Sequence, residues 1–162
     1  MKKSVFTETE QKAIQEKVGQ LKRIKDGTLS VQELVNLIVQ RRLNWLKENL
    51  RRLLKKYAHL DDLEKAHMII GFENMKIDQT KQKITRVSST KIRIDSYNFC
   101  PYLEACKILG LDTRFVCKEI METSTQTVLE AINPRIKFSR NYQNIRPYNP
   151  AYCEEYLELV ED

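Results

Sequence analysis

The spacing of apolar residues changes once along this chain, and that change constrains the fold more than any other feature. Over the first 72 residues the apolar side chains recur every three or four positions, which is typical of amphipathic helices. Further along the spacing shortens to two, with Ile92 and Ile94 separated by charged residues, which is typical of a half-buried strand. We therefore expect an α+β protein with a helical N-terminal part, 1–75, and a second part, 76–162.

Two capping boxes mark helix starts in the N-terminal part. Thr7 is followed by Glu10, and Ser30 by Glu33, the spacing at which two side chains satisfy each other's backbone N–H groups. The second box opens the longest predicted helix, over 30–58. Its apolar stripe reads Val31, Val35, Val39, Leu43, Leu46, Leu50, Leu53 and Tyr57. At about 1.5 Å per residue the helix is about 40 Å long, more than one small core covers, so we expect one end to pack on another element or in a homodimer.

The remaining elements follow from turn residues and from the change of period. We expect a helix over 61–72, a hairpin within 76–97 turning at 88–90, helices over 101–109 and 113–132, and strands over 135–141 and 152–160. This order, N-terminal helices and then ββααββ, predicts an antiparallel sheet with helices on one face. Because no Gly/Ser/Pro-rich linker separates the two parts, we expect them to pack together.

Composition narrows the setting. The longest apolar runs are shorter than 18 residues, and no apolar segment follows the basic residues Lys2 and Lys3, so we expect no membrane span and no export signal. A cytoplasmic location is the resulting prediction. In a reducing compartment thiols act as ligands, nucleophiles or core residues more often than as disulfides.

Positive charge gathers on the long predicted helix, and the net charge is +6. The cluster consists of Arg41, Arg42, Lys47, Arg51, Arg52, Lys55 and Lys56. Contact with nucleic-acid phosphates is one interpretation, and a solvated helix face is the other and the one we favour. The two histidines, His59 and His67, are eight residues apart, which favours surface or core positions over a ligand pair on one helix.

All four cysteines lie in the second part, at Cys100, Cys106, Cys117 and Cys153. Their spacing lacks the two-residue knuckle of structural zinc sites. Three of them nevertheless fall at element ends, where a strand meets a helix, where a helix begins and where the last strand begins, so these ends can converge. A helix N-terminus stabilises a thiolate, whereas free cysteines are also common core residues. Cys106 lies on the inward face of its helix, which favours packing.

Several short motifs around these cysteines resemble one known family. They are Cys100-Pro101-Tyr102-x-Glu104, Leu109-Gly110, Cys117, Asn133-Pro134-x-Ile136-x-Phe138-x-Arg140 and Cys153-Glu154. Over roughly residues 85–160 the chain resembles the L-2-amino-thiazoline-4-carboxylic acid hydrolase-like family. The resemblance implies hydrolysis of a C–N or C–S bond in a small cyclic amidine-type substrate, held in a pocket lined by Cys100, Cys117 and Cys153.

In the hydrolase interpretation a thiolate of Cys100 or Cys117 attacks the amidine carbon. A carboxylate carries the proton, with Glu119, Glu122 and Glu154 as candidates. We expect Arg146, in a Pro-flanked loop, to bind a substrate carboxylate through its guanidinium fork. Tyr102 and Glu154 are further candidates for substrate contact.

Two metal-based interpretations stay open beside it. Cys100, Cys117 and Cys153 with one carboxylate can hold a divalent metal that activates water. With Cys106 as a fourth ligand the set can instead bind zinc or an iron–sulfur cluster. The protein is then a non-enzymatic sensor whose basic helices contact DNA or a protein partner. The second part contains no histidine, which counts against a Cys–His catalytic pair.

Overall fold

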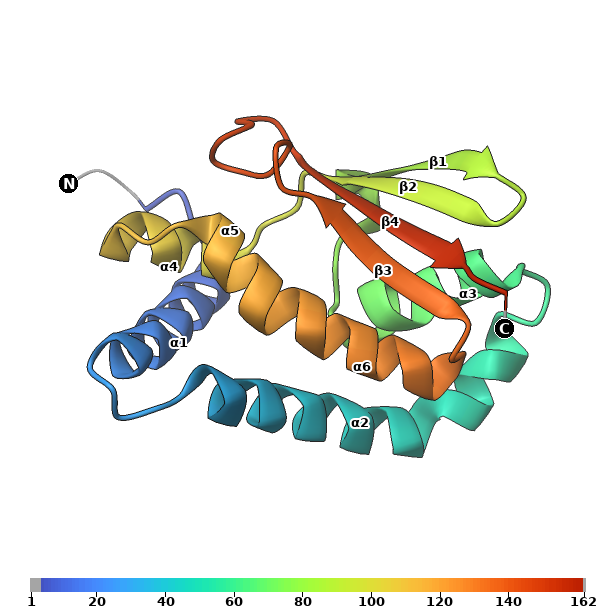
Figure 1. The fold of residues 1–162 in the computed structure, drawn as a ribbon, viewed down its shortest axis with the longest axis horizontal. Coiled ribbons are helices and arrows are strands. Elements are labelled where there is room, and N and C mark those ends of the chain that lie inside the picture. The colour runs from blue at the N-terminus through green and yellow to red at the C-terminus, as the bar shows by residue number, and fades with distance from the viewer. Residues whose placement is uncertain (1–3, 162) are drawn as a thin grey trace.

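The computed structural model describes residues 4–161, in which helices pack against a four-stranded antiparallel sheet (Figure 1). The elements in chain order are α1 (Glu8–Lys25), α2 (Val31–Lys56), α3 (Asp62–His67), the π-helix η1 (Met68–Asn74), the 3₁₀ turn η2 (Gln79–Lys81), β1 (Gln82–Ser88), β2 (Lys91–Ser96), α4 (Pro101–Leu109), α5 (Thr113–Val116), the π-helix η3 (Cys117–Glu122), α6 (Thr123–Ile132), β3 (Ile136–Asn141) and β4 (Cys153–Leu159). The α+β class is confirmed.

Both capping boxes form as the sequence predicts. The hydroxyl of Thr7 accepts from the backbone N–H of Glu10 at 3.1 Å, and the Glu10 carboxylate accepts from Thr7 at 3.0 Å. Ser30 and Glu33 make the same reciprocal pair at 3.0 and 3.1 Å. These bonds satisfy N–H groups that a helix start otherwise leaves without a partner, so both helices begin where the sequence places them.

The strand order is β1-β2-β4-β3, which places the last strand in the interior of the sheet. Leu157 of β4 lies opposite Ile92 on one side and Phe138 on the other, and these residues form the apolar face toward the helices. The alternate positions, such as Arg93 and Tyr156, form a polar face that points away. The polar end of the inner face, where β2 ends and β4 begins, is the part that borders the candidate site.

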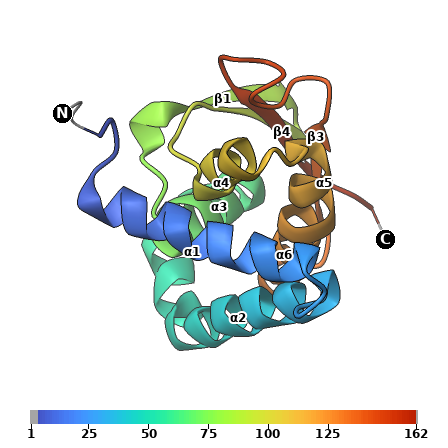
Figure 2. The same ribbon diagram turned by 90° about the vertical axis from the view of Figure 1, so that its left-hand side faces the viewer.

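Helix α2 passes beneath two core clusters. In both views it runs along the base of the molecule with α6 above it (Figures 1 and 2). Leu34 and Ile38 belong to a cluster with α1 and α4, whereas Leu46 and Leu53 belong to one with the sheet and α6. Two clusters within the same chain therefore account for the length of this helix, and the homodimer stays a prediction. Each cluster contains residues from both sides of position 75, so the two predicted parts share their cores.

The buried face of α2 differs from the predicted stripe in its first half. Leu34, Ile38 and Arg42 are buried, whereas Val39 and Leu43 are only half-buried. The sequence of this helix is apolar over a wide arc, so periodicity alone left the orientation open by about one residue. The packing partners decided it, because α6 and η3 lie over the side that carries Arg42.

Two predicted helices contain a π-helical segment. The helix predicted over 61–72 is α3 followed by η1, and the one predicted over 113–132 is α5, η3 and α6 in succession. A π-helical turn accommodates an extra residue within a helix and is frequent at functional sites. Among residues 4–161, no helix is long and apolar enough to cross a membrane.

Adjacent leucines near the end of α2 test the assignment of its core face. Leu53 is fully buried, whereas Leu54 is 38% exposed. We expect Leu53→Ala to lower the free energy of unfolding by about 2–5 kcal/mol, since it opens a cavity in the core. Leu54→Ala is the matched control and should cost no more than about 1 kcal/mol. Urea unfolding measures both, and equal losses would contradict the assigned face.

Candidate functional site

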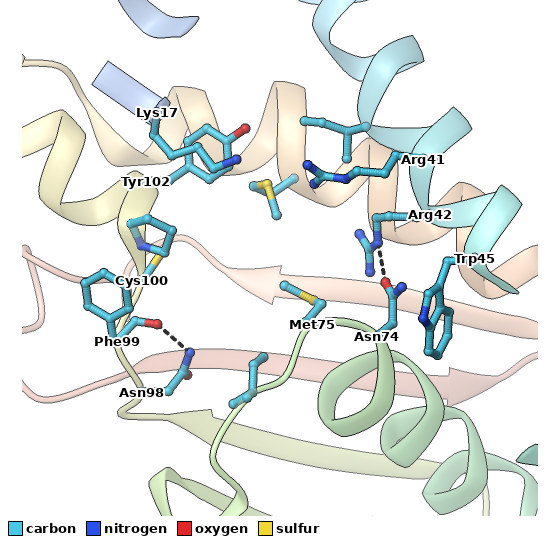
Figure 3. A pocket seen from close by; sticks show the side chains of 14 residues that line it. Lys17, Arg41, Arg42, Trp45, Asn74, Met75, Asn98, Phe99, Cys100 and Tyr102 are labelled. Atoms are coloured by element: carbon cyan, nitrogen blue, oxygen red, sulfur yellow. Dashed lines mark hydrogen bonds between the residues drawn. The ribbon is translucent and has the colours of Figure 1, made fainter. Parts of the chain in front are cut away.

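A pocket of about 410 Å³ opens between α2, the start of α4 and the turn after η1 (Figure 3). We call it the outer chamber. Its apolar lining comes mainly from Ile38, Trp45, Met75, Ile77, Phe99, Pro101, Tyr102 and Met121. Its polar lining consists of Lys17, Arg41, Arg42, Asn74 and Asn98, with Cys100 at its inner end. Among the described residues that line it there is therefore no carboxylate.

Arg42 is the least usual group in this chamber. Its side chain lies between α2 and α6 and the residue is only 5% exposed. Its Nε donates to Asn74 Oδ1 at 2.8 Å and its Nη1 to Thr125 Oγ1 at 3.4 Å, while its buried Nη2 has no partner. Burial, and then the charge of Arg41, lower the pKa of Arg42 to about 10, so the guanidinium is still charged at neutral pH. Arg42 is therefore a buried cation whose hydrogen-bond partners are both neutral.

Two further cations converge on the same space. Lys17 and Arg41 extend toward each other across the chamber (Figure 3). Lys17 lies 5.1 Å from the ring centroid of Tyr102, and burial lowers the pKa of its ammonium group, against the nearby Glu16. Lys17 also pairs with Glu16, with 3.4 Å between Nζ and Oε1, so the positive field that attracts an anion comes mainly from Arg41 and Arg42.

A second pocket of about 120 Å³, the inner chamber, adjoins the outer one. Five residues line both chambers: Met75, Ile77, Asn98, Cys100 and Met121. Its walls are the polar end of the inner sheet face, including Ser96, Arg140 and Glu155, and residues of both π-helical segments, including Gly71 and Cys117. Both irregular helical segments thus border the same pocket, as expected if the irregularity serves a site.

Three of the four cysteines line the inner chamber, as predicted, and the structure separates them by environment. Burial raises the pKa of the Cys100 thiol, and it raises that of Cys117 to about 12, so both are protonated at neutral pH. Cys153 differs because Arg146 donates two bonds to its sulfur, from the backbone N at 3.4 Å and from Nε at 3.3 Å. Cys106 is 1% exposed in a core cluster and packs, as its position in the sequence predicts.

The polar end of the sheet also holds a buried ion pair. Arg140 of β3 lies opposite Glu155 of β4, with 3.2 Å between Nη2 and Oε1. Burial lowers the pKa of Arg140, but the charge of Glu155 and smaller contributions from Cys117, Cys153 and Tyr142 together outweigh burial and raise it. The other donors of Arg140, Nε and Nη1, are buried without a partner. Arg146 adds a second guanidinium, whose Nη1 donates to the carbonyl of Asn98 at 2.7 Å.

His67 also lines this chamber, so the pocket contains a histidine that the sequence distribution did not indicate. The residue is 4% exposed, and its Nε2 pairs with Gln79 Oε1 at 2.9 Å. Burial lowers the pKa of His67, although the bond to Gln79 acts in the opposite direction, so the ring is neutral at pH 7. Gly71, one helical turn later, allows this approach, since a Cβ there would lie 3.3 Å from the His67 ring.

The other predicted site residues lie in three places. Tyr102 lines the outer chamber and Arg146 the inner one. Glu119 and Glu122 line neither and border a separate depression beside Lys118 and Thr123. Glu154 points to the polar outer face of the sheet, where burial would raise its pKa but bonds from Tyr156, Asn144 and Asn141 outweigh burial and lower it. The carboxylate that lines the same chamber as the thiols is Glu155, which the sequence analysis did not select.

The two metal interpretations receive no support from the geometry. Within residues 4–161, no three His, Cys, Asp or Glu side chains lie where they could hold one metal ion. Cys106 lies in the core cluster around α1 and α4 and lines neither chamber, so the fold does not assemble the predicted four-cysteine ligand set.

The basic cluster on α2 divides into two groups. Arg41 and Arg42 line the outer chamber, whereas Lys47, Arg51 and Arg52 are exposed elsewhere on the helix. The solvated-face interpretation fails for Arg42, which is buried, whereas Arg41 is exposed although it lines the chamber. The burial of Arg42 could have been predicted from its spacing, because it lies four residues after Ile38 and four before Leu46, on the same side of the helix as both.

The burial of His67 predicts a pH dependence of stability. Because its pKa is lower in the folded chain than the usual value near 6.5, the unfolded chain binds a proton first as the pH falls. The free energy of unfolding should therefore decrease as the pH falls from about 7 through this usual value. His67→Gln should flatten this slope in urea unfolding between neutral and mildly acidic pH. The exposed His59 provides the control: if His59→Gln flattened the profile as much, His67 would not be the cause.

No family model matches this chain, and a search of curated proteins gives no match. Among solved structures, the fold is similar to subunit 3 of the trafficking protein particle complex from Naegleria fowleri, a crystal structure described as covalently bound to palmitic acid. The TM-score is 0.51 at 15% sequence identity, and the similarity covers 94% of this chain and 95% of that chain. At this identity the similarity establishes the fold alone.

Proposed function

We propose that this protein binds a small organic anion with an apolar body in the outer chamber. One observation carries the proposal: the guanidinium of Arg42 is 5% exposed, has an unpartnered Nη2, and is held by Asn74 and Thr125, both neutral. Burying an unpaired charge costs several kcal/mol, so this arrangement is unfavourable for stability by itself. An anionic ligand offsets that penalty, because its negative charge pairs with the buried guanidinium.

The rest of the chamber defines the ligand. Lys17 and Arg41 add positive charge beside Arg42, and a carboxylate matches the fork of a guanidinium. Trp45, Phe99 and other apolar side chains provide the walls, so the body of the ligand is apolar. A volume of about 410 Å³ is in the usual range for small-molecule sites. The Naegleria subunit is described as covalently bound to palmitic acid, which supports an apolar body for the ligand of a chain with this fold.

Octanoate is a suitable probe, since it combines an apolar chain with one carboxylate. We expect it to bind the wild-type protein in isothermal titration calorimetry. Arg42→Gln should weaken binding by about tenfold to a hundredfold, because a hydrogen bond to a charged group contributes about 1.5–3 kcal/mol and about 1.4 kcal/mol corresponds to a factor of ten.

Two controls distinguish this effect from unfolding. Arg51→Gln removes an exposed charge from the same helix outside the chamber and should leave octanoate affinity unchanged. Because Arg42→Gln removes a buried unpaired charge, its melting temperature without ligand should equal or exceed that of the wild type. Equal octanoate affinities for wild type and a folded Arg42→Gln variant would contradict the proposal.

A second candidate function is hydrolysis of a small cyclic amidine that carries a carboxylate, the activity that the family resemblance implies. The observation that favours it is the position of Cys100, Cys117 and Cys153 around one chamber that adjoins the anion site. In this candidate the carboxylate of the substrate lies at Arg42 and its ring extends toward the thiols.

Among these thiols we propose Cys153 as the nucleophile, in place of Cys100 or Cys117. Its sulfur accepts two bonds from Arg146, which hold it in place in the chamber, whereas burial raises the pKa of the other two thiols. Attack by the Cys153 sulfur forms a C–S bond, moves the C=N electron pair to the ring nitrogen and transfers the thiol proton to that nitrogen. The C–S bond of the ring then breaks, and its sulfur leaves as a thiol. Water adds to the same carbon and the bond to Cys153 breaks, which releases a carbamoyl product and returns a proton to the Cys153 sulfur.

The test uses L-2-amino-thiazoline-4-carboxylic acid and follows its loss by chromatography. We expect turnover by the wild-type protein and none above buffer by Cys153→Ser. Cys106→Ala, which alters a thiol outside the chambers, should retain activity if the variant remains folded. Full activity in Cys153→Ser would exclude this nucleophile, and an inactive wild-type protein that still binds octanoate would exclude the hydrolase candidate while leaving the binding function.

A further inference from the structure

All of the unpartnered buried polar side-chain atoms in the described part of the chain belong to two arginines. They are Nη2 of Arg42 and Nε and Nη1 of Arg140. Arg42 lines the outer chamber and Arg140 the inner one. Native proteins leave few buried polar groups without a partner, and each such group calls for a specific explanation. Here all three atoms are donors beside adjoining cavities, which indicates two separate positions for an acceptor.

The surroundings of Arg140 are positively charged, and two of its donor groups have no hydrogen-bond acceptor. Arg140 and Arg146 both line the inner chamber, and Glu155 is the one carboxylate among the described residues of its lining. His67 adds no positive charge at neutral pH, because burial lowers its pKa. The ion pair with Glu155 uses only Nη2 of Arg140, so the N–H groups of Nε and Nη1, which flank Nη2, remain for a ligand. An oxygen acceptor, and in particular an anionic one, suits this place.

The two chambers share part of their lining. The chambers share Met75 and Met121, and methionine is the apolar side chain that most readily changes conformation. Thr125, which accepts from Arg42, also lines the inner chamber, so the anion site borders both spaces. A ligand that occupies both acceptor positions would pass between these shared side chains, which are mostly apolar and flexible.

We propose that the ligand carries two acidic groups, one bound at Arg42 and one at Arg140, joined by an apolar spacer. The chemical class is a dicarboxylic acid. This inference rests on the proposed anion-binding function and adds to it, since that function requires only the site at Arg42. A water molecule is the competing acceptor for Arg140, as the inner chamber exceeds the ~30 Å³ that one water occupies in the liquid.

The experiment compares dicarboxylates with monocarboxylates of the same number of carbons, from glutarate to sebacate, by calorimetry at constant ionic strength. Matched pairs keep chain length fixed and vary only the second carboxylate. We expect at least one dicarboxylate to bind the wild-type protein about tenfold or more tightly than its monocarboxylate, the factor that one charge-assisted hydrogen bond provides.

A paired variant tests where the second group binds. Arg140→Gln combined with Glu155→Gln removes the donors without leaving Glu155 as a buried unpaired charge. The ratio of dicarboxylate to monocarboxylate affinity should fall to about one in this variant. Arg135→Gln, an exposed arginine just before β3, is the control and should keep the wild-type ratio.

Each outcome decides a different point. If monocarboxylates bind and no dicarboxylate binds more tightly, water satisfies Arg140 and this inference is wrong while the anion-binding function stands. A preference that persists in the paired variant would also overturn it, because the second carboxylate would then bind elsewhere. If neither class binds, the proposed function itself fails.

Discussion

The burial of one guanidinium, that of Arg42, organises the centre of this molecule. Arg42 lies on the face of α2 between Ile38 and Leu46, where the two core clusters meet, and it is charged at neutral pH. A buried charge needs polar partners, and the structure provides them from two directions, with Asn74 at the end of η1 and Thr125 on α6. These bonds connect α2, η1 and α6 around the pocket. Because both partners are neutral, they satisfy donors without balancing the charge, and this imbalance is the basis of the anion site that we propose.

The inner chamber has its own origin in the register of the sheet. Along the inner face of β4 the side chains change from Leu157 to Glu155 to Cys153, that is, from apolar to charged to thiol. Helices can cover the apolar end closely, whereas the polar end keeps a cavity and an ion pair between Arg140 and Glu155. Both π-helical segments border this end. An extra residue in a helical turn changes which side chains face the sheet, and in this way η1 and η3 bring Gly71 and Cys117 to the chamber.

Much of the fold could be predicted from local sequence signals, because those signals act over a few residues. Thr7 and Ser30 start their helices through bonds to side chains three positions away, and Gly110 ends α4 in a left-handed conformation with φ of 66°. The thiols at element ends were also found, since converging ends follow from element order. His67 and Arg42 were not. Their roles depend on which side of a helix is covered, and a wide apolar arc leaves that open by one residue.

By itself, the sequence determined the elements, their caps, the α+β class and the three cysteines that meet in the pocket. Only the tertiary structure decided the order of the strands, the division of the basic cluster into buried and solvated arginines, and the separation of Glu119 and Glu122 from the thiols. The physical reason is the range of the interactions involved. Caps and periodicity depend on neighbours along the chain, whereas the burial of a charge and the partner of a thiol depend on segments that are far apart in sequence, such as Arg42 and Thr125, until the core brings them together.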